Sequence, residues 1–269
     1  MTIVDPSEEV EVGPSLLNKF LDAYPLLKKA FTTMTRDSEY AALVEMSNVM
    51  AVKRLLYNDH GPVHARIVAG SALEIFERLV ASGIKPTTLE HKTVENYEQS
   101  LLVVLLGTML HDVGNSVHRS NHELIGALLS GGLLNRVLTR ILGTKTEAKR
   151  RYMIRQEILH VIYSTAYDVQ SLTVEAGSVK LGDGTDMSQG RARFPYRLGK
   201  NDIHAVSALA IEKVTIASSS EKPVVINVHM KEKAGVFQIE KVLQPKIATS
   251  GLDKYVEVRA FHNGREFKV

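Results

Sequence analysis

Six of the ten histidines in this 269-residue chain fall between positions 60 and 122. Within that range, residues 101–110 (LLVVLLGTML) are almost entirely apolar and end directly in His111-Asp112. Burying an unpaired carboxylate is costly, so Asp112 needs a compensating positive charge. No Lys or Arg stands between Lys92 and Arg119, so that charge comes from elsewhere in the fold or from a metal ion. The alternative is that Asp112 hydrogen-bonds the VGNS turn that follows it.

Two further residues extend apolar helical stripes. His64 continues the stripe of a helix predicted to begin at Pro62, and Asp183 continues that of residues 172–183, with Asp186 one turn further on. Taken singly, His64 is compatible with a buried histidine bonded to a carbonyl, and Asp183 with a helix-ending GDGTD turn. Taken together, two imidazoles and two carboxylates from three helices suit Mn, Fe, Zn, Ni or Mg. Four protein ligands leave positions for water or substrate on an octahedral ion, as hydrolysis requires.

The elements that must position these residues are mainly helices. Hydrophobic periodicity predicts an all-helical bundle over residues 14–203 and a small α+β module, ββαβ-like, over residues 204–269, while residues 1–13 read as a loose tail. Helices are expected over 15–34 with a break at Pro25, 38–57, 62–81, 94–113, 120–129 with an end at Gly131-Gly132, 147–164 and 171–182. The module is expected to contain strands over 211–217, 224–230 and 255–261 and a helix over 237–247.

Composition narrows the class of protein. Hydrophobic residues are 44% and charged residues 23% of the chain, which is typical of a globular domain. The net charge of +3 is too small to indicate nucleic-acid binding but suits anionic small molecules. Because there is no cysteine, any metal is held by nitrogen and oxygen ligands. The acidic start lacks the features of a signal peptide and no apolar run is long enough for a bilayer span, so a cytoplasmic protein without membrane partners is expected.

Three of these segments resemble a known family. HARIVA (64–69), LHDVG (110–114) and LGDGTDM (181–187) resemble, in this order, the H…HD…D signature of the HD superfamily of metal-dependent phosphohydrolases. The resemblance covers about residues 50–195. It implies that His64, His111, Asp112 and Asp183 are ligands of a divalent metal, and that the substrate is a phosphorylated small molecule such as a nucleotide.

The same resemblance raises the question of a second metal. HELIG (122–126) is similar to the His-x-x-x-Gly block of two-metal members, which would make His122 a ligand. Those members have another histidine on the next helix, for which His160 is the candidate, although the spacing favours the position of Thr165. His60 is a further candidate. The glycine-tyrosine-proline segment of the HD-GYP branch is absent, so one or two ions remain possible.

Other polar residues complete the predicted site. His118 or His122 is expected to protonate the leaving group. Arg191, Arg193 and Arg197, with Lys200, form either a phosphate clamp or a solvated loop. The module is expected to support a homodimer through a strand edge, to bind a regulator, or to act as a structural cap. The alternative to an enzyme is a catalytically silent ligand-sensing or scaffold protein with the same fold.

Overall fold

The apolar segment at positions 101–110 lies inside α6 (Tyr97–Leu110), the central helix of the protein. The computed structural model describes residues 2–55, 61–143, 146–187 and 203–268. The side chain of Asn96 caps α6 by accepting a hydrogen bond from the Gln99 N–H, and every residue from Gln99 to Leu110 is buried. Four other helices pack around α6, which explains why it is apolar on all faces. These are α2 (Pro25–Thr35), α4 (Pro62–Ala81), α8 (Ala148–Ser164) and α9 (Val174–Thr185).

The prolines begin helices as predicted. Pro25 separates α1 (Leu16–Ala23) from α2, and Pro62 is the first residue of α4, where a missing N–H costs nothing. The remaining helical elements of the body are α3 (Ser38–Asn48), a π-helix at Val49–Arg54, α5 (Thr87–Glu90), a 3-10 turn at Val113–Ser116 and α7 (His122–Leu142).

Several helix boundaries predicted from the sequence are wrong, and the helix expected over 94–113 runs only from Tyr97 to Leu110. The helix expected to end at Gly131-Gly132 continues as α7 to Leu142, because residues beyond the glycines, among them Leu133 and Leu138, are buried against other helices. This burial outweighs the cost of about 1 kcal/mol for each glycine in a helix. The segment expected to be helical from residue 171 becomes helical only at Val174, where Thr173 caps α9 through the Ala176 N–H.

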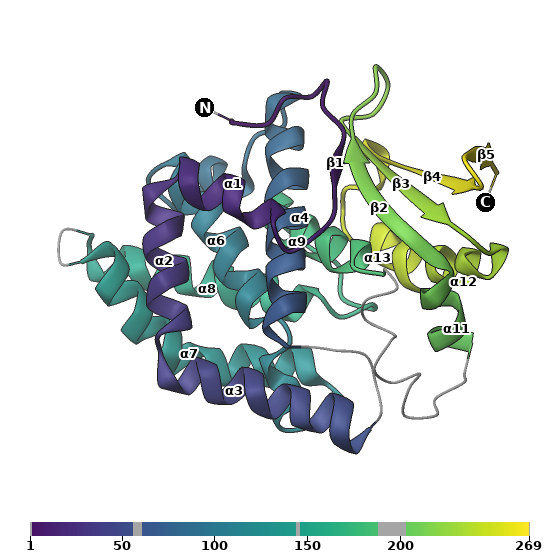
Figure 1. Cartoon of the computed structure of the whole chain (residues 1–269). Coiled ribbons are helices and arrows are strands. Elements are labelled where there is room, and N and C mark those ends of the chain that lie inside the picture. Colours follow the sequence, from purple (N-terminus) through teal and green to yellow (C-terminus); the bar gives the residue numbers. More distant parts are fainter. Residues whose placement is uncertain (1, 56–60, 144–145, 188–202, 269) are drawn as a thin grey trace.

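The predicted α+β module is present and larger than expected. A five-stranded sheet has the order β1-β2-β3-β4-β5 and lies beside the helical body (Figure 1). Its strands are β1 (Val10–Glu11), β2 (Ile211–Ala217), β3 (Val224–Met230), β4 (Val256–His262) and β5 (Arg265–Phe267). β3 and β4 are parallel, while the other pairs are antiparallel.

A parallel pair requires a crossover connection. Here the crossover runs through a 3-10 turn (Lys233–Gly235), α12 (Val236–Gln238), a π-helix (Ile239–Leu243) and α13 (Gln244–Ala248). A 3-10 turn at Asp253–Tyr255 then leads into β4, and α11 (Ile203–Ala210) precedes β2. The crossover contacts α9 in the helical body.

The prediction of a loose tail at residues 1–13 is wrong, because much of this segment is held against the body. β1 pairs with β2, and the N–H groups of Ile3 and Val4 donate to Glu77 Oε2 at 2.7 and 3.2 Å. The buried Arg78 donates to Glu8 O at 2.6 Å and to Ser218 Oγ at 2.8 Å. These bonds join the N-terminal segment, α4 and the end of the sheet.

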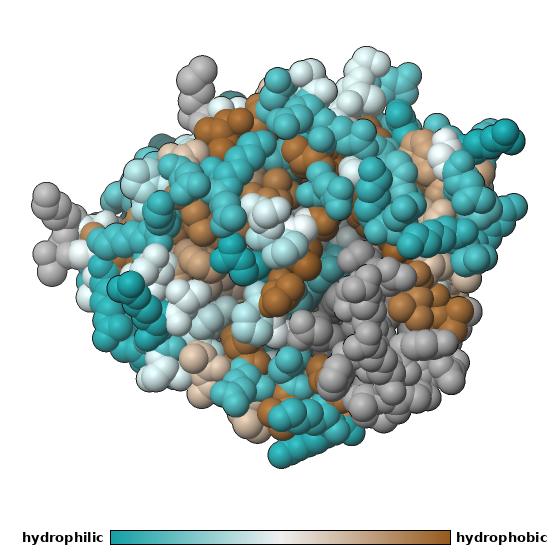
Figure 2. All heavy atoms as spheres, viewed as in Figure 1, coloured by the Kyte–Doolittle hydropathy of each residue, from teal (hydrophilic) through white to brown (hydrophobic). Residues whose placement is uncertain are grey.

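Two hydrophobic clusters divide the interior. One fills the helical bundle, and the other lies between the sheet and one side of α4 and α9. α7 is long and apolar enough to span a membrane by length and composition, but such a helix is weak evidence, since core helices pass the same test. In this structure α7 packs against α8 and α2. Hydrophobic side chains on the face seen in Figure 2 form separate groups among hydrophilic ones.

Candidate metal centre

His64, His111 and Asp183 meet at one point, although they come from three different helices. One nitrogen or oxygen atom from each lies within 4.8 Å of the others, so this buried group could hold a metal ion. His64 Nε2 is 3.2 Å from His111 Nε2 and 3.4 Å from Asp183 Oδ1. Asp112 Oδ2 lies 3.2 Å from His64 Nε2 and 3.3 Å from His111 Nε2. The structure thus brings together the four residues that the sequence proposed as one ligand set.

The outer nitrogens of the two imidazoles fix their orientation. His64 Nδ1 is 2.6 Å from Asp186 Oδ2, and His111 Nδ1 is 2.7 Å from the Thr108 carbonyl oxygen. Both partners accept hydrogen bonds, so both Nδ1 atoms carry hydrogen and the Nε2 atoms face the cluster. Metal-ligating histidines are held in this way.

The separations also suit coordination. Ligand atoms about 2.1 Å from an ion and about 90 to 110° apart are about 3.0 to 3.4 Å from each other. Four of the contacts among the ring nitrogens and carboxylates of His64, His111, Asp112 and Asp183, at 3.2 to 3.4 Å, fall in this range. The contact between His111 Nε2 and Asp183 Oδ1, at 3.7 Å, is longer.

The cluster is electrostatically coupled. Burial alone would lower the pKa of His111, but the adjacent Asp112 and Asp183 carboxylates outweigh burial and raise that pKa to about 10. Burial would raise the pKa of Asp183, but the charge of Lys246 and hydrogen bonds from His111 and His64 hold it well below its ordinary value. These carboxylates therefore attract positive charge, whether it is a proton or a metal ion.

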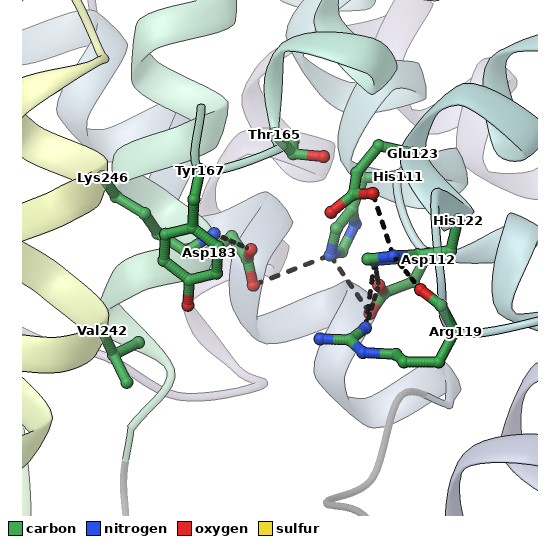
Figure 3. Close-up of a pocket in the computed structure, with 10 residues that line it drawn as sticks. All are labelled: His111, Asp112, Arg119, His122, Glu123, Thr165, Tyr167, Asp183, Val242 and Lys246. Carbon is green, nitrogen blue, oxygen red and sulfur yellow. Dashed lines mark hydrogen bonds and ion pairs between the residues drawn. The ribbon is translucent and has the colours of Figure 1, made fainter. Parts of the chain in front are cut away.

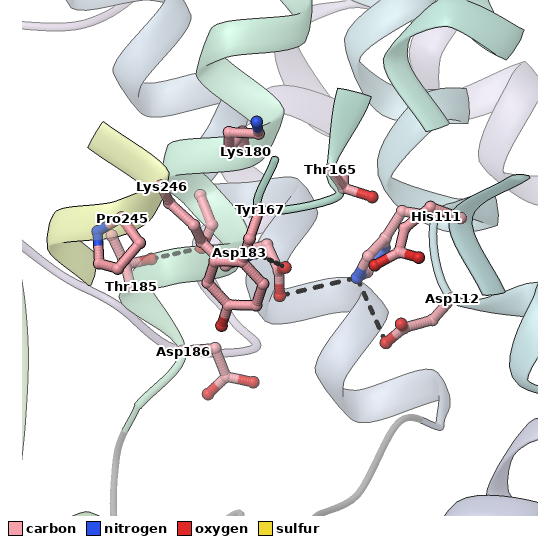
Figure 4. A network of polar contacts seen from close by, with 12 residues as sticks. His111, Asp112, Thr165, Tyr167, Lys180, Asp183, Thr185, Asp186, Pro245 and Lys246 are labelled. Atoms are coloured by element: carbon pink, nitrogen blue, oxygen red, sulfur yellow. Dashed lines mark hydrogen bonds and ion pairs between the residues drawn. The ribbon is translucent and has the colours of Figure 1, made fainter. Parts of the chain in front are cut away.

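Lys246 reaches the cluster from α13, in the C-terminal module. Its Nζ is 2.6 Å from Asp183 Oδ2 and 4.6 Å from the centre of the Tyr167 ring (Figure 4). Burial lowers the pKa of a lysine, but the Asp183 carboxylate raises that of Lys246 above its ordinary value, so its side chain is charged. The crossover between β3 and β4 thus supplies a compensating charge from elsewhere in the fold, although its direct partner is Asp183 and not Asp112.

A second group of polar residues lies on the other side of Asp112. His122 Nε2 is 3.3 Å from Asp112 Oδ1, and Arg119 Nη1 is 3.0 Å from His122 Nε2. His122 Nδ1 lies 3.0 Å from Glu123 Oε2. Burial would raise the pKa of Glu123, but the contact with His122 lowers it. Asn115 Nδ2 donates to Asp112 Oδ1 at 3.0 Å, so the Asp112 carboxylate does bond within the VGNS turn, as the alternative interpretation expected.

Gly114 and Gly126 allow the turn that follows Asp112 to lie close to the helix that carries His122. A Cβ at Gly114 would lie 1.9 Å from the His122 carbonyl oxygen and 2.5 Å from the Gly126 N atom. Only glycine therefore allows the turn after Asp112 to pack on the first turn of α7. This close contact of main chains explains the glycines in LHDVG and HELIG.

Residues of both groups line one pocket of about 60 Å³ (Figure 3), whereas His64 borders a smaller adjacent cavity together with His111 and Asp112. Lys246, Tyr167 and Asp183 lie on one side of it, and Arg119 and His122 on the other. A pocket of this size has room for a few water molecules or a small polar group. The residues that line it are His111, Asp112, Arg119, His122, Glu123, Thr165, Tyr167, Asp183, Val242 and Lys246.

The structure does not bring two of the predicted site residues to this pocket. His118 is exposed, and its Nδ1 accepts a hydrogen bond from the Ser120 N–H at 3.0 Å. His160 contacts Ser164 Oγ, and its Nε2 accepts from the Leu172 N–H at 3.2 Å. His160 lies five residues, about 1.4 helical turns, before Thr165 and so faces another side of the helix, while Thr165 lines the pocket. The prediction of His160 as a metal ligand is therefore not supported.

The predicted phosphate clamp lies outside the described residues and is therefore not tested; it consists of Arg191, Arg193, Arg197 and Lys200. His60, the further candidate ligand, also lies outside the described residues.

Sequence reasoning missed Lys246, Tyr167 and the contact of Arg119 with His122. A signal for Lys246 exists, because it follows the buried Ile239 and Leu243 at intervals of four and three and so lies on the apolar face of its segment. The sequence contains no comparable signal for Tyr167, which lies in the connection between α8 and α9.

The fold and site define a helical bundle joined to a five-stranded sheet, with a buried His/Asp group that could hold a metal ion. The chain is 41% identical over 233 residues to the uncharacterized protein MJ1020 of Methanocaldococcus jannaschii, covering 87% of this chain and 88% of the relative. It therefore belongs to the same family as that archaeal protein. No protein-family model matches the chain. No solved structure matches it either.

Proposed function

We propose that the protein is a metal-dependent phosphohydrolase of the HD superfamily. Its substrate would be a phosphomonoester or phosphodiester, such as a nucleotide or a related small molecule. The observation that carries this proposal is the convergence of two Nε2 atoms and two carboxylates beside a pocket, with both Nδ1 atoms donating hydrogen bonds to outer partners. This arrangement suits Mn, Fe, Ni, Zn or Mg held by His64, His111, Asp112 and Asp183.

The chain's own residues would prepare the pocket for a phosphate group. A bound divalent ion would supply a water of lowered pKa and attract phosphate oxygens. Asp186 and the Thr108 carbonyl hold the two imidazoles in their orientation. Lys246 and Arg119, on opposite sides of the pocket, retain N–H groups that can donate to phosphate oxygens and stabilise developing negative charge.

The test combines metal analysis with an activity screen. Purified protein, loaded with Mn²⁺ or Ni²⁺, is assayed against phosphomonoesters, nucleotides and cyclic nucleotides. Turnover of at least one class is expected, and Asp112→Ala should abolish both metal content and turnover. Asp168→Ala is the matched control, because Asp168 is exposed and does not line the pocket. Absence of both metal and turnover in the unaltered protein would overturn the proposal.

One observation favours the second candidate, a catalytically silent ligand-sensing or scaffold protein. Lys246 already neutralises one carboxylate of the cluster without any metal. In such a protein, Asp112→Ala would change only the melting temperature or the oligomeric state. The same set of variants therefore separates the two candidates.

A further inference from the structure

The hydrogen bonds of His122 define which of its nitrogens carries hydrogen. His122 Nδ1 lies 3.0 Å from two acceptors, Glu123 Oε2 and the Arg119 carbonyl oxygen. Nδ1 therefore carries the hydrogen, and the lone pair is on Nε2. His64 and His111 show the same outer arrangement. His122 is thus oriented like a metal ligand, with its Nε2 on the pocket side.

Two groups face His122 Nε2: the Asp112 carboxylate, whose Oδ1 is 3.3 Å away, and the closer guanidinium of Arg119. Arg119 Nη1 lies 3.0 Å from His122 Nε2, 3.2 Å from Asn115 Oδ1 and 4.0 Å from Asp112 Oδ1. Asn115 in turn donates to Asp112 Oδ1 at 3.0 Å, so it holds both the carboxylate and the arginine. A guanidinium only donates hydrogen bonds and stays charged at any ordinary pH, so it uses the lone pair that a metal would need.

We infer that Arg119 takes the place of a second metal ion, so that the centre holds one ion, and that His122 positions Arg119 rather than binding metal. This inference rests on the proposed function and deepens it. The side chain of Arg119 is 36% exposed and lines the pocket, so it presents a fixed positive charge to the substrate. His122 Nε2 then holds Arg119 beside Asp112, so we assign His122 no role in protonating the leaving group.

The first test compares two histidines of the same pocket. Protein stripped with a chelator is titrated with Mn²⁺, and bound ions are counted by elemental analysis. Unaltered protein is expected to hold about one ion per chain. His111→Leu should remove the bound Mn²⁺ ion, whereas His122→Leu should keep about one ion with an affinity lowered by roughly tenfold to a hundredfold at most, the range expected for a residue that acts through a neighbour.

The second test removes the guanidinium. Arg119→Met should gain a second, weaker Mn²⁺ ion, detected as spin coupling between two ions by electron paramagnetic resonance. Arg119→Met with His122→Leu should return to about one ion. Arg140→Met is the matched control, because Arg140 is an exposed arginine on α7 that does not line the pocket. Circular dichroism of each variant shows that it is folded.

The outcomes distinguish a failure of the inferred role of Arg119 from a failure of the proposed function. Two ions in the unaltered protein, loss of an ion in His122→Leu, or a single ion in Arg119→Met would each overturn the role of Arg119 while leaving a metal-dependent enzyme intact. No ion in the unaltered protein would overturn the proposed function and the inference with it.

Discussion

The two sides of the pocket neutralise their carboxylates with cations of different origin. On one side, Asp183 is paired with Lys246, which stands 63 residues further along the chain and belongs to the C-terminal module. On the other side, Asp112 lies near Arg119, only seven positions away on the following turn. Lys246 is buried and 2.6 Å from its carboxylate, whereas Arg119 is half-exposed and 4.0 Å from its own. The cation beside Asp112 therefore comes from a nearby position in the sequence, whereas the cation beside Asp183 is placed by the tertiary structure.

The largest expected effect is at Asp183. Asp183→Asn removes a ligand oxygen and leaves the buried Lys246 charge unpaired, which costs about 3 to 5 kcal/mol of unfolding free energy in the metal-free protein. Mn²⁺ content should fall to background and any hydrolysis by roughly a hundredfold or more. Elemental analysis and denaturant unfolding measure both effects. Full metal content in Asp183→Asn would show that Asp183 is not a ligand and would contradict the assignment of a metal-binding carboxylate to each side of the pocket.

Lys246→Met is expected to have the next largest effect. This substitution leaves the Asp183 carboxylate buried without its lysine. The unfolding free energy of the metal-free, chelator-treated protein should therefore fall by about 3 kcal/mol. Arg119→Met should cost less than about 1 kcal/mol, because the Arg119–Asp112 pair is 4.0 Å long and the Arg119 side chain is partly exposed. Mn²⁺ should restore the stability of Lys246→Met more than that of Arg119→Met, as thermal unfolding can show. Equal costs for the two substitutions would contradict a difference between the two sides.

Lys180 offers a contrast with Lys246, because it is a buried lysine whose hydrogen-bond partners are carbonyl and hydroxyl oxygens and not a carboxylate. Its Nζ donates to carbonyl oxygens and to Thr249 Oγ1, and burial together with the charge of Lys246 lowers its pKa to about 8. The ordinary lysine value is 10.5, so the unfolded chain binds more protons between pH 8 and 10.5. The contribution of Lys180 to stability therefore rises with pH across this window, by about 2 to 3 kcal/mol.

The measurement compares unaltered protein with Lys180→Met by denaturant unfolding at several pH values. The stability difference between the two should change in favour of the unaltered protein from pH 8 to 10.5. Other titrating groups, including His111, cancel when the two proteins are subtracted at each pH. A constant difference would show that Lys180 keeps an ordinary pKa.

The smallest effect is expected at His118, which lies outside the pocket although His122 lines it. His118→Ala should change the unfolding free energy by less than about 0.5 kcal/mol, as is usual at exposed positions. Metal content and turnover should equal those of unaltered protein. A loss of turnover with unchanged stability would return His118 to the catalytic role that the sequence suggested.

Features that depend on neighbours in the chain could be predicted from the sequence. The apolar helix before His111-Asp112, the helix start at Pro62 and strands β2 and β3 follow from periodicity and backbone chemistry. The convergence of His64, His111, Asp112 and Asp183 was anticipated because each ends or extends an apolar helical stripe.

Features that depend on distant segments could not be predicted in this way. The two residues of β1 are too few to show a strand pattern, and their pairing with β2 depends on the sheet that forms about 200 positions later. The pairing of Asp183 with Lys246 depends on how the crossover packs against α9. The passage of α7 through Gly131-Gly132 depends on the neighbours that bury Leu133 and Leu138. In each case tertiary contacts override the local preference.

The crossover that supplies Lys246 also sets the order in which the site can be completed during synthesis. A growing chain presents Asp183 to its histidines 63 residues before the lysine emerges. Contacts of such long sequence separation form late, because their closure entropy must be overcome first. A nascent or truncated chain that ends before α13 therefore contains the helical body without the lysine that pairs with Asp183. Ligand binding that depends on Lys246 thus reports that the crossover has packed against the helical body.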